Sequence, residues 1–315
     1  MADAPIERIH ARPVPRPGTW IAAVVVVLLA AGLVHSLVTN PNYRWDVVAQ
    51  YLFDARVLQG VGWTLILTVT SMLIGVILAV TTAVMRMSTN VVLRWVAYGY
   101  IWFFRGTPIY TQLIFWGLFA VLYPTIGLGL PFAEPWVEFD TQHVMDGFSA
   151  RGFLPALLGL GLNEGAYLSE IVRSGLNSID KGQWEASTAL GMKRSVTLRR
   201  IIIPQAMRVI VPPTGNETIS MLKTTSLVTA VPFMLDLTFA TSQIGTQTFL
   251  PVPMLIVAAT WYLAITSVLM VVQARIEAHY GKGFDPERPG RLNRRQQSVA
   301  TAQTAKDDPF LEVTP

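Results

Sequence analysis

Long apolar stretches restrict the fold of this sequence more than any other feature. A helix needs about 20 mostly apolar residues to cross the hydrocarbon core of a bilayer. Because the bilayer supplies no water to unpaired backbone groups, such stretches cross it as helices. We therefore predict an all-α, polytopic membrane protein with about six transmembrane helices. The predicted spans are Trp20–Val38, Gly62–Met85, Trp95–Tyr123, Phe153–Leu176, Ala206–Pro232 and Val252–Gln273.

Composition agrees with the membrane class and excludes several kinds of site. Only 14% of the 315 residues are charged, whereas a soluble domain carries about a quarter. The absence of cysteine excludes disulfides, thiolate catalysis and iron–sulfur clusters. The four histidines are widely scattered along the chain, so we predict no metal site.

The basic residues predict the orientation of the spans. Eighteen Lys and Arg residues lie in or beside segments 1–19, 86–94, 177–205 and 274–315, against three in the outer segments 39–61, 124–152 and 233–251. Lys and Arg are retained on the cytoplasmic side, so both termini are predicted to be cytoplasmic. The first span could instead be a cleaved signal peptide, but its length and the lack of an A-x-A site favour an uncleaved anchor.

The remaining segments divide the chain further. We predict a cytoplasmic tail over 1–19, an extra first span over 20–38, an outer interfacial segment over 39–61, a transmembrane domain over 62–275, and a largely disordered cytoplasmic tail over 276–315. The outer segment 124–152 is too long for a tight turn and too polar to span. It contains Glu134, Glu138, Asp140 and Asp146.

The loop over 177–205 carries the most specific pattern. Asp180 is a good N-cap for a short helix over Gly182–Leu190, and Gly191 is a good stop. Pro204 lies where the next span begins, a position that tolerates a missing N–H. A basic loop that only sets topology is one alternative. A DNA-binding helix-turn-helix is another, but it needs soluble helices around it and spans begin on both sides here.

The spacing in this loop resembles the EAA loop of ABC importer permeases. Residues Glu185-Ala186-Ser187, then Gly191 after three residues, then Ile201-x-Ile203-Pro204 after nine, are similar to the family pattern E-A-A, G and I-x-L-P. Ser187 and Ile203 are the departures from it. Four other motifs resemble the polar amino acid permease branch: RGTPIYTQL (105–113), GAYLSEIVRSGLNSIDKGQWEA (165–186), PQAMR (204–208) and LKTTSLV (222–228).

The resemblance implies a fold and a set of partners. It implies a five-helix importer core, to which this chain adds the first span, in the plasma (inner) membrane of a prokaryote. It implies that Glu185, Ala186, Ser187 and Gly191 belong to a coupling helix that docks on an ATP-binding cassette subunit. A second permease subunit, identical or paralogous, and an extracytoplasmic solute-binding protein are the other implied partners.

No G-x-x-x-x-G-K-[ST] motif occurs in the chain. We therefore expect ATP and Mg to bind the partner subunit, and this chain to bind no cofactor and to have no catalytic residue. Membrane lipid is an expected partner, and nucleic acid is not.

Five ionisable residues stand out within the predicted spans: Arg105, Glu164, Glu170, Glu217 and Lys223. Such groups are costly in a bilayer and need a partner or a function. One interpretation is ion pairing, for example of Glu170 with Arg173 or Arg105. A structural or gating role is expected for Arg105, Thr107, Pro108, Glu170 and Pro204, which match family motifs. The other hypothesis is an amino-acid site formed by Asn163, Glu164, Asn216, Glu217 and Lys223.

These features predict the permease subunit of an ATP-driven importer for a polar amino acid. The alternative is a secondary transporter of amino acids driven by an ion gradient, which should show inverted repeats, and none is convincing here. Nothing in the sequence resembles a catalytic triad or a cofactor fingerprint. The two carboxylates favour a cationic or zwitterionic substrate, whereas Lys223 and Arg105 favour an anionic one, so the amino acid stays open.

Overall fold

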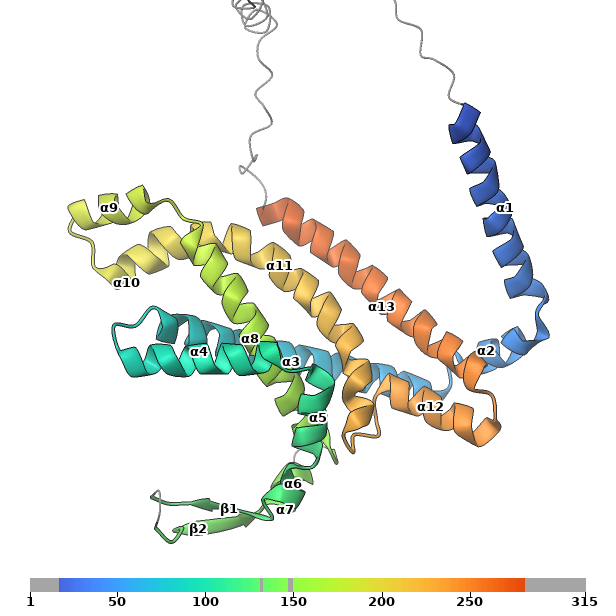
Figure 1. Cartoon of the computed structure of the whole chain (residues 1–315), viewed down its shortest axis with the longest axis horizontal. Coiled ribbons are helices and arrows are strands. Elements are labelled where there is room, and N and C mark those ends of the chain that lie inside the picture. The colour runs from blue at the N-terminus through green and yellow to red at the C-terminus, as the bar shows by residue number, and fades with distance from the viewer. Residues whose placement is uncertain (1–16, 131–132, 147–149, 281–315) are drawn as a thin grey trace, which may run out of the picture.

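The computed structural model describes residues 17–130, 133–146 and 150–280, and most of these residues are helical (Figure 1). The predicted tails over 1–19 and 276–315 lie largely outside these ranges. Six helices carry most of the architecture. They are α1 (Pro17–Thr39), α3 (Ala55–Arg86), α4 (Val91–Gly106), α8 (Phe153–Asn177), α11 (Ile203–Thr224) and α13 (Pro251–Tyr280).

Shorter elements connect these helices. They are a 3-10 turn (Pro41–Tyr43), α2 (Trp45–Tyr51), α5 (Ile109–Gly117), α6 (Phe119–Leu122), β1 (Thr125–Leu128), β2 (Val137–Asp140), α7 (Thr141–Asp146), α9 (Lys181–Ala189), α10 (Arg194–Thr197), a π-helical turn (Leu198–Ile202), a second 3-10 turn (Thr225–Ala230) and α12 (Leu237–Thr248).

Three of the described helices are long and apolar enough to cross a membrane, over Trp20–Thr39, Ala55–Arg86 and Pro251–Tyr280. The other predicted spans are less regular. The third is divided into α4, α5 and α6, while α8 contains three charged residues and α11 contains Pro212 and Pro213. At 1.5 Å per residue, the 25 residues of α8 and the 22 of α11 still extend over a bilayer core.

The core forms where α3 packs on α8, because both helices present small residues. A face of small residues on α3 is buried, including Gly60, Thr64, Ser71 and Gly75. A Cβ added at Gly60 would lie 2.9 Å from the Cα of Leu237 in α12. Small side chains let helix backbones approach closely, so this face holds α8 and α12 near α3. An apolar cluster then fills the space around them, with Leu67, Leu113, Phe153, Leu160 and Phe233 among its buried members.

The outer insertion corrects the all-α prediction. β1 and β2 form an antiparallel hairpin, with Thr125 opposite Asp140 and Leu128 opposite Val137. Thr, Ile, Val and Phe favour extended backbone, while Pro124 and Pro135 flank the strands and discourage a helix. Figure 1 shows the hairpin at the opposite end of the molecule from α9.

The extra N-terminal helix stands apart from the other helices (Figure 1). None of its apolar window is buried by the residues that the structure describes. It is joined to the body through α2, whose Val47 and Val48 pack in a second apolar cluster with α12 and α13. The indole N–H of Trp45 also donates to the carbonyl of Leu37, at 2.8 Å. The predicted outer interfacial segment therefore contains a helix that packs on α13.

Candidate functional site

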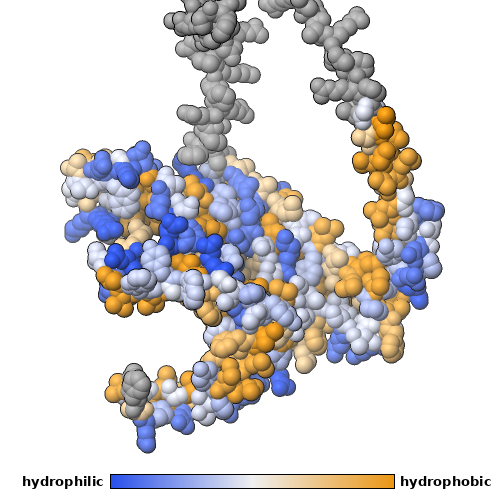
Figure 2. Space-filling view, in the orientation of Figure 1, coloured by the Kyte–Doolittle hydropathy of each residue, from blue (hydrophilic) through white to orange (hydrophobic). Residues whose placement is uncertain are grey.

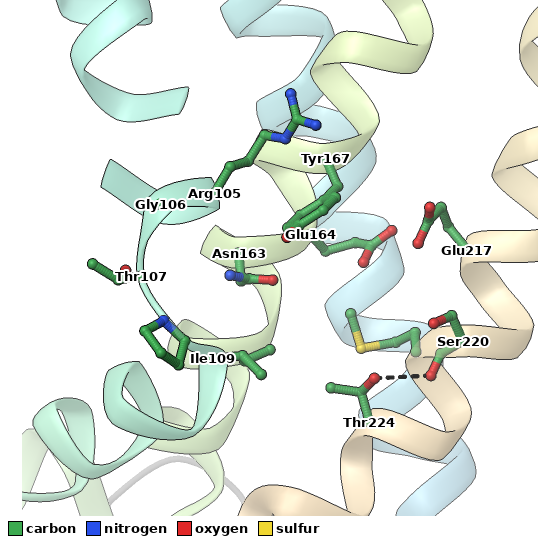
Figure 3. A pocket seen from close by; sticks show the side chains of 12 residues that line it. Arg105, Gly106, Thr107, Ile109, Asn163, Glu164, Tyr167, Glu217, Ser220 and Thr224 are labelled. Carbon is green, nitrogen blue, oxygen red and sulfur yellow. Dashed lines mark hydrogen bonds between the residues drawn. The ribbon is translucent and has the colours of Figure 1, made fainter. Parts of the chain in front are cut away.

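A cavity of about 460 Å³ lies between α4, α5, α8 and α11 (Figure 3). Helices α4, α8 and α11 carry the five ionisable residues singled out from the sequence. Its size falls within the range of small-molecule sites, about 300–1,000 Å³. The lining residues are Arg105, Gly106, Thr107, Pro108, Ile109, Asn163, Glu164, Tyr167, Glu217, Ser220, Met221 and Thr224.

One wall of the cavity is the break between α4 and α5. Pro108 has no N–H and disfavours helical backbone at the residue before it, and Thr107 is extended, with φ −113° and ψ 145°. Side chains satisfy the carbonyls that the break leaves free. The Gln112 amide donates to the carbonyls of Phe104 (3.0 Å) and Thr107 (3.1 Å), and the Asn163 amide donates to the carbonyl of Phe104 (2.9 Å). Asn163 therefore holds the α4–α5 break against α8.

Two carboxylates face each other across the cavity. Glu164 of α8 and Glu217 of α11 extend toward one another (Figure 3). Glu164 is 5% exposed, and its Oε1 is buried without a hydrogen-bond partner in the described part of the chain. Neither residue forms an ion pair with a described residue. Two facing carboxylates without a cation favour a positively charged ligand between them.

A positive charge also lines the cavity, on Arg105 in the last turn of α4. The Arg105 guanidinium lies over the ring of Tyr167, 5.2 Å from its centroid. An arginine held on an aromatic face keeps its donors free to bind a carboxylate. The cavity therefore offers an anionic pair that complements a positive group of a ligand, and one cation that complements a carboxylate.

The other predicted charged residues lie elsewhere. Asn216 and Lys223 are exposed and do not line the cavity. Glu170 pairs with Arg86 of α3 and, at 2.7 Å, with Arg173 of its own helix. The predicted pairing of Glu170 with Arg173 is confirmed, and the contact with Arg86 adds a link between α3 and α8.

Three polar lining residues were not predicted: Tyr167, Ser220 and Thr224. Each lies three or four residues from another lining residue on its helix. Such spacing places side chains on one helix face. Helical spacing from Glu164 and Glu217 could therefore have predicted these three lining residues.

The predicted short helix of the loop is present as α9. The Asp180 carboxylate accepts from the N–H of Gly182 at 2.6 Å, and Gly191 adopts φ +68° beyond the last turn. A left-handed residue there is the usual end of a helix. Glu185 and Ala186 are exposed, whereas Ser187 is 2% exposed and its hydroxyl donates to the carbonyl of Gln183 at 2.6 Å. Hydrophilic residues gather over α9 and α10 in Figure 2.

Pro204 lies in the first turn of α11, as predicted. Gln205, beside it, donates to the Gln183 side chain at 3.5 Å. The start of α11 is therefore tied to α9. Among the described residues, no group of three or more His, Asp and Glu side chains could hold a metal ion.

Comparison with known proteins identifies a family and an architecture. The family model described as "Binding-protein-dependent transport system inner membrane component" matches residues 71–282. A solved amino acid ABC transporter, crystallised with histidines, has a chain 29% identical to this one, with a TM-score of 0.61, over 73% of this chain and 97% of that one. A chain of the MetNI methionine ABC transporter is similar in fold, with a TM-score of 0.54.

Sequence relatives are amino acid permeases. The arginine transport system permease protein ArgU of Corynebacterium glutamicum is 52% identical over 275 residues, 87% of this chain and 84% of that protein. The nopaline transport system permease protein NocM of Agrobacterium fabrum is 37% identical over 218 residues, 68% of this chain and 83% of that protein. The probable amino-acid ABC transporter permease protein YckA of Bacillus subtilis is 34% identical over 249 residues, 76% of this chain and 97% of that protein.

Proposed function

This chain belongs to the family of binding-protein-dependent transport system inner membrane components, the amino acid ABC transport permeases, and from that membership we propose that it imports a cationic amino acid of the arginine class. The observation that carries this proposal is the pair of carboxylates, Glu164 and Glu217, which has no ion-pair partner among the described residues and lines the same cavity as Arg105. The substrate's side-chain cation lies between the two carboxylates. Its α-carboxylate binds Arg105.

The names of relatives agree with this substrate class. ArgU is an arginine permease, and so is ArtQ of Bacillus subtilis, which is 33% identical over 221 residues. The cystine permease TcyB is 35% identical over 234 residues, so similarity alone does not choose the substrate. The choice rests on the charges in the cavity.

ATP supplies the energy for transport through a separate nucleotide-binding subunit. α9 is the element of this chain that docks on it, because its exposed face carries Glu185 and Ala186, and it contacts Gln205 in the first turn of α11. Movement of α9 is transmitted to α11, which carries Glu217. The cavity then opens alternately to each side of a multi-pass protein in a prokaryotic plasma membrane. A second permease subunit and an extracytoplasmic solute-binding protein complete the complex.

Uptake in proteoliposomes tests the substrate. The full-length chain is reconstituted with the subunits encoded beside it, and uptake of labelled arginine is measured with unlabelled competitors. We expect lysine to compete strongly, and glutamine and glutamate to compete weakly. Glu164→Gln and Glu217→Gln should each raise the KM for arginine about tenfold or more, equivalent to about 1.4 kcal/mol.

Asn216→Ala is the matched control, because Asn216 adjoins Glu217 but is exposed and does not line the cavity. Its KM should equal that of the unmodified chain. Equal competition by glutamine and lysine, or an unchanged KM in both Glu variants, would contradict the cationic substrate. Uptake that continues without ATP would contradict the ATP-driven mechanism and support the ion-gradient alternative.

A further inference from the structure

A second, larger cavity lies between α3, α8, α11 and α13 and shares no lining residue with the carboxylate cavity. Its volume is about 820 Å³. We name it the apolar groove. Side chains that represent its walls are Val80, Val172, Met207, Val211 and Ile276, and Arg194 of α10 lies at its edge.

The polar side chains inside the apolar groove are already satisfied by the chain. The Thr214 hydroxyl donates to the carbonyl of Ile210 (2.7 Å), and the Thr218 hydroxyl donates to the carbonyl of Thr214 (3.0 Å). The Gln273 amide donates to the carbonyl of Pro212 at 2.7 Å. Because these groups need no further partner, the groove suits an apolar occupant better than a polar solute.

The apolar groove is open to its surroundings rather than sealed. Val80 is 50% exposed and Val84 is 65% exposed, and both line it. Large apolar cavities are unfavourable when they stay empty, because their walls lose contacts. In a membrane, the surrounding lipid supplies those contacts.

Arg194 adds a charge to this otherwise apolar site. It forms no ion pair with a described residue. Three further basic residues of the same segment are exposed, namely Lys193, Arg199 and Arg200. This end of the molecule is the one that the basic residues predict to face the cytoplasm, where anionic headgroups attract such segments.

From this arrangement we propose that the apolar groove binds one acyl chain of an anionic phospholipid, whose phosphate binds Arg194. The occupant must be apolar along its length and negative at one end, and a phospholipid has both properties. A second copy of this chain fits less well. It has the same orientation in the membrane, so it would bring its own basic segment to the same depth and repel this one.

The test uses the full-length chain with the subunits that co-purify, in vesicles of phosphatidylcholine and phosphatidylglycerol. A phosphatidylglycerol with a photoreactive diazirine near the end of one acyl chain identifies the residues it contacts. Native mass spectrometry after detergent extraction counts the lipids retained. This proposal needs only membrane insertion, so it stands or fails independently of the transported substrate.

Two variants have matched controls. Arg194→Gln should reduce retention of phosphatidylglycerol about five-fold or more, because the phosphate of the bound lipid loses its charge-assisted hydrogen bond at the edge of the groove. Arg199→Gln removes the same charge from the same segment outside the groove and should leave retention unchanged. Val211→Trp fills the groove and should abolish labelling, whereas Val69→Trp, on an exposed part of α3 outside the groove, should not.

We expect photolabelling of groove residues on α3 and α11 in the unmodified chain, and retention of phosphatidylglycerol over phosphatidylcholine. Equal retention of the two lipids, or equal loss in Arg194→Gln and Arg199→Gln, would overturn the proposal. Crosslinks from the groove to a second copy of the chain would overturn it too. If a variant fails to fold, labelling of the unmodified chain still decides.

Discussion

At the scale of single residues, the position of Glu164 depends on a glycine in the neighbouring helix. A Cβ added at Gly75 would lie 2.8 Å from Cγ of Glu164 and 3.1 Å from its Cβ. The absence of a side chain at Gly75 therefore makes room for the first part of the glutamate between α3 and α8. The small residues of α3 favour close helix packing, but their pattern alone does not indicate that a carboxylate occupies the space.

Gly75→Ala tests this dependence. Overpacking at such a contact shifts side chains at a cost of about 1–3 kcal/mol, and the shift here falls on Glu164. We expect the KM for the substrate to rise about tenfold while the protein still inserts in the membrane. Gly62→Ala is the control, because nothing lies within 4 Å of a Cβ at Gly62. An unchanged KM in Gly75→Ala would mean that Glu164 has room to move.

Substitution of Gln112 tests how far the α4–α5 break depends on side-chain hydrogen bonds. Its amide donates to Phe104, Thr107 and the Thr107 hydroxyl, and Gln112 is 4% exposed. Gln112→Leu leaves buried carbonyls without this donor, at a cost of about 1–3 kcal/mol. We expect a lower midpoint of thermal unfolding and a weaker transport activity. Gln142→Leu, which loses an exposed hydrogen bond to Asp146, should change neither quantity measurably.

At the scale of elements, the exposed face of α9 should contact the ATP-binding subunit and its buried face should not. Sequence alone treated Ala186 and Ser187 as equivalent contact positions. The helix exposes Ala186 and buries Ser187. Because the chain has no native cysteine, single cysteine variants report one position each. Ala186→Cys should crosslink to the ATP-binding subunit in intact cells, and Ser187→Cys should not. Crosslinks at 187 alone would mean that α9 turns when it docks.

Asp236 makes α12 sensitive to pH. It caps α12 by accepting from the N–H of Thr238 at 2.7 Å, in the segment between the last two predicted spans. Burial raises the pKa of Asp236 from 3.8 to about 6. The folded state therefore holds the proton more tightly than the unfolded state, so stability is greatest below about pH 4 and falls as pH rises to about 6, by roughly 3 kcal/mol in total.

Asp236→Asn should remove this dependence while it keeps a good cap, because asparagine is also favoured at the N-cap. The measurement is the thermal unfolding midpoint in detergent between pH 4 and pH 7. The unmodified chain should lose stability over this range more steeply than the variant. Parallel curves would show that Asp236 does not control the pH response.

The helical elements followed from apolar length, but their interruptions did not. Apolar runs indicate where a chain can cross a bilayer, and α3, α8 and α13 lie where those runs predict. The break at Thr107–Pro108 lies inside one continuous apolar run, so apolar length did not predict it. Pro108 was a local indication, because proline interrupts helices. The β1–β2 hairpin was not predicted, because the acidic side chains of the segment indicated only that it is too polar to span the membrane. Its Thr, Ile, Val and Phe residues favour strands.

At the scale of the whole molecule, the candidate site depends on which helices meet, and the sequence could specify this only in part. Depth along the spans suggested that Asn163, Glu164 and Glu217 share a cavity, and the structure brings these three together. The same reasoning included Asn216 and Lys223, which the rotation of α11 leaves outside. Helix rotation is set by packing against neighbours, and a single sequence carries only the periodicity of each helix.

The extra helix α1 lies apart from the rest of the described chain. None of its apolar window is buried by the described residues, and the matched family model begins only at residue 71. The other helices therefore have little contact with α1 to lose. Fifteen of the eighteen basic residues that set the predicted orientation lie after residue 39, so the remaining spans should keep their direction.

A chain that begins at Asn40 should therefore insert with α9 still cytoplasmic and should keep most of its transport activity. Labelling of the Ala186→Cys variant from each side of the membrane measures the orientation, and uptake in proteoliposomes measures the activity. The full-length Ala186→Cys chain is the control for both. Inverted labelling would show that Arg8, Arg12 and Arg16 are needed to orient the protein. Correct labelling with lost uptake would show instead that α1 contacts another subunit of the transporter, because the described residues of this chain leave its apolar window unburied.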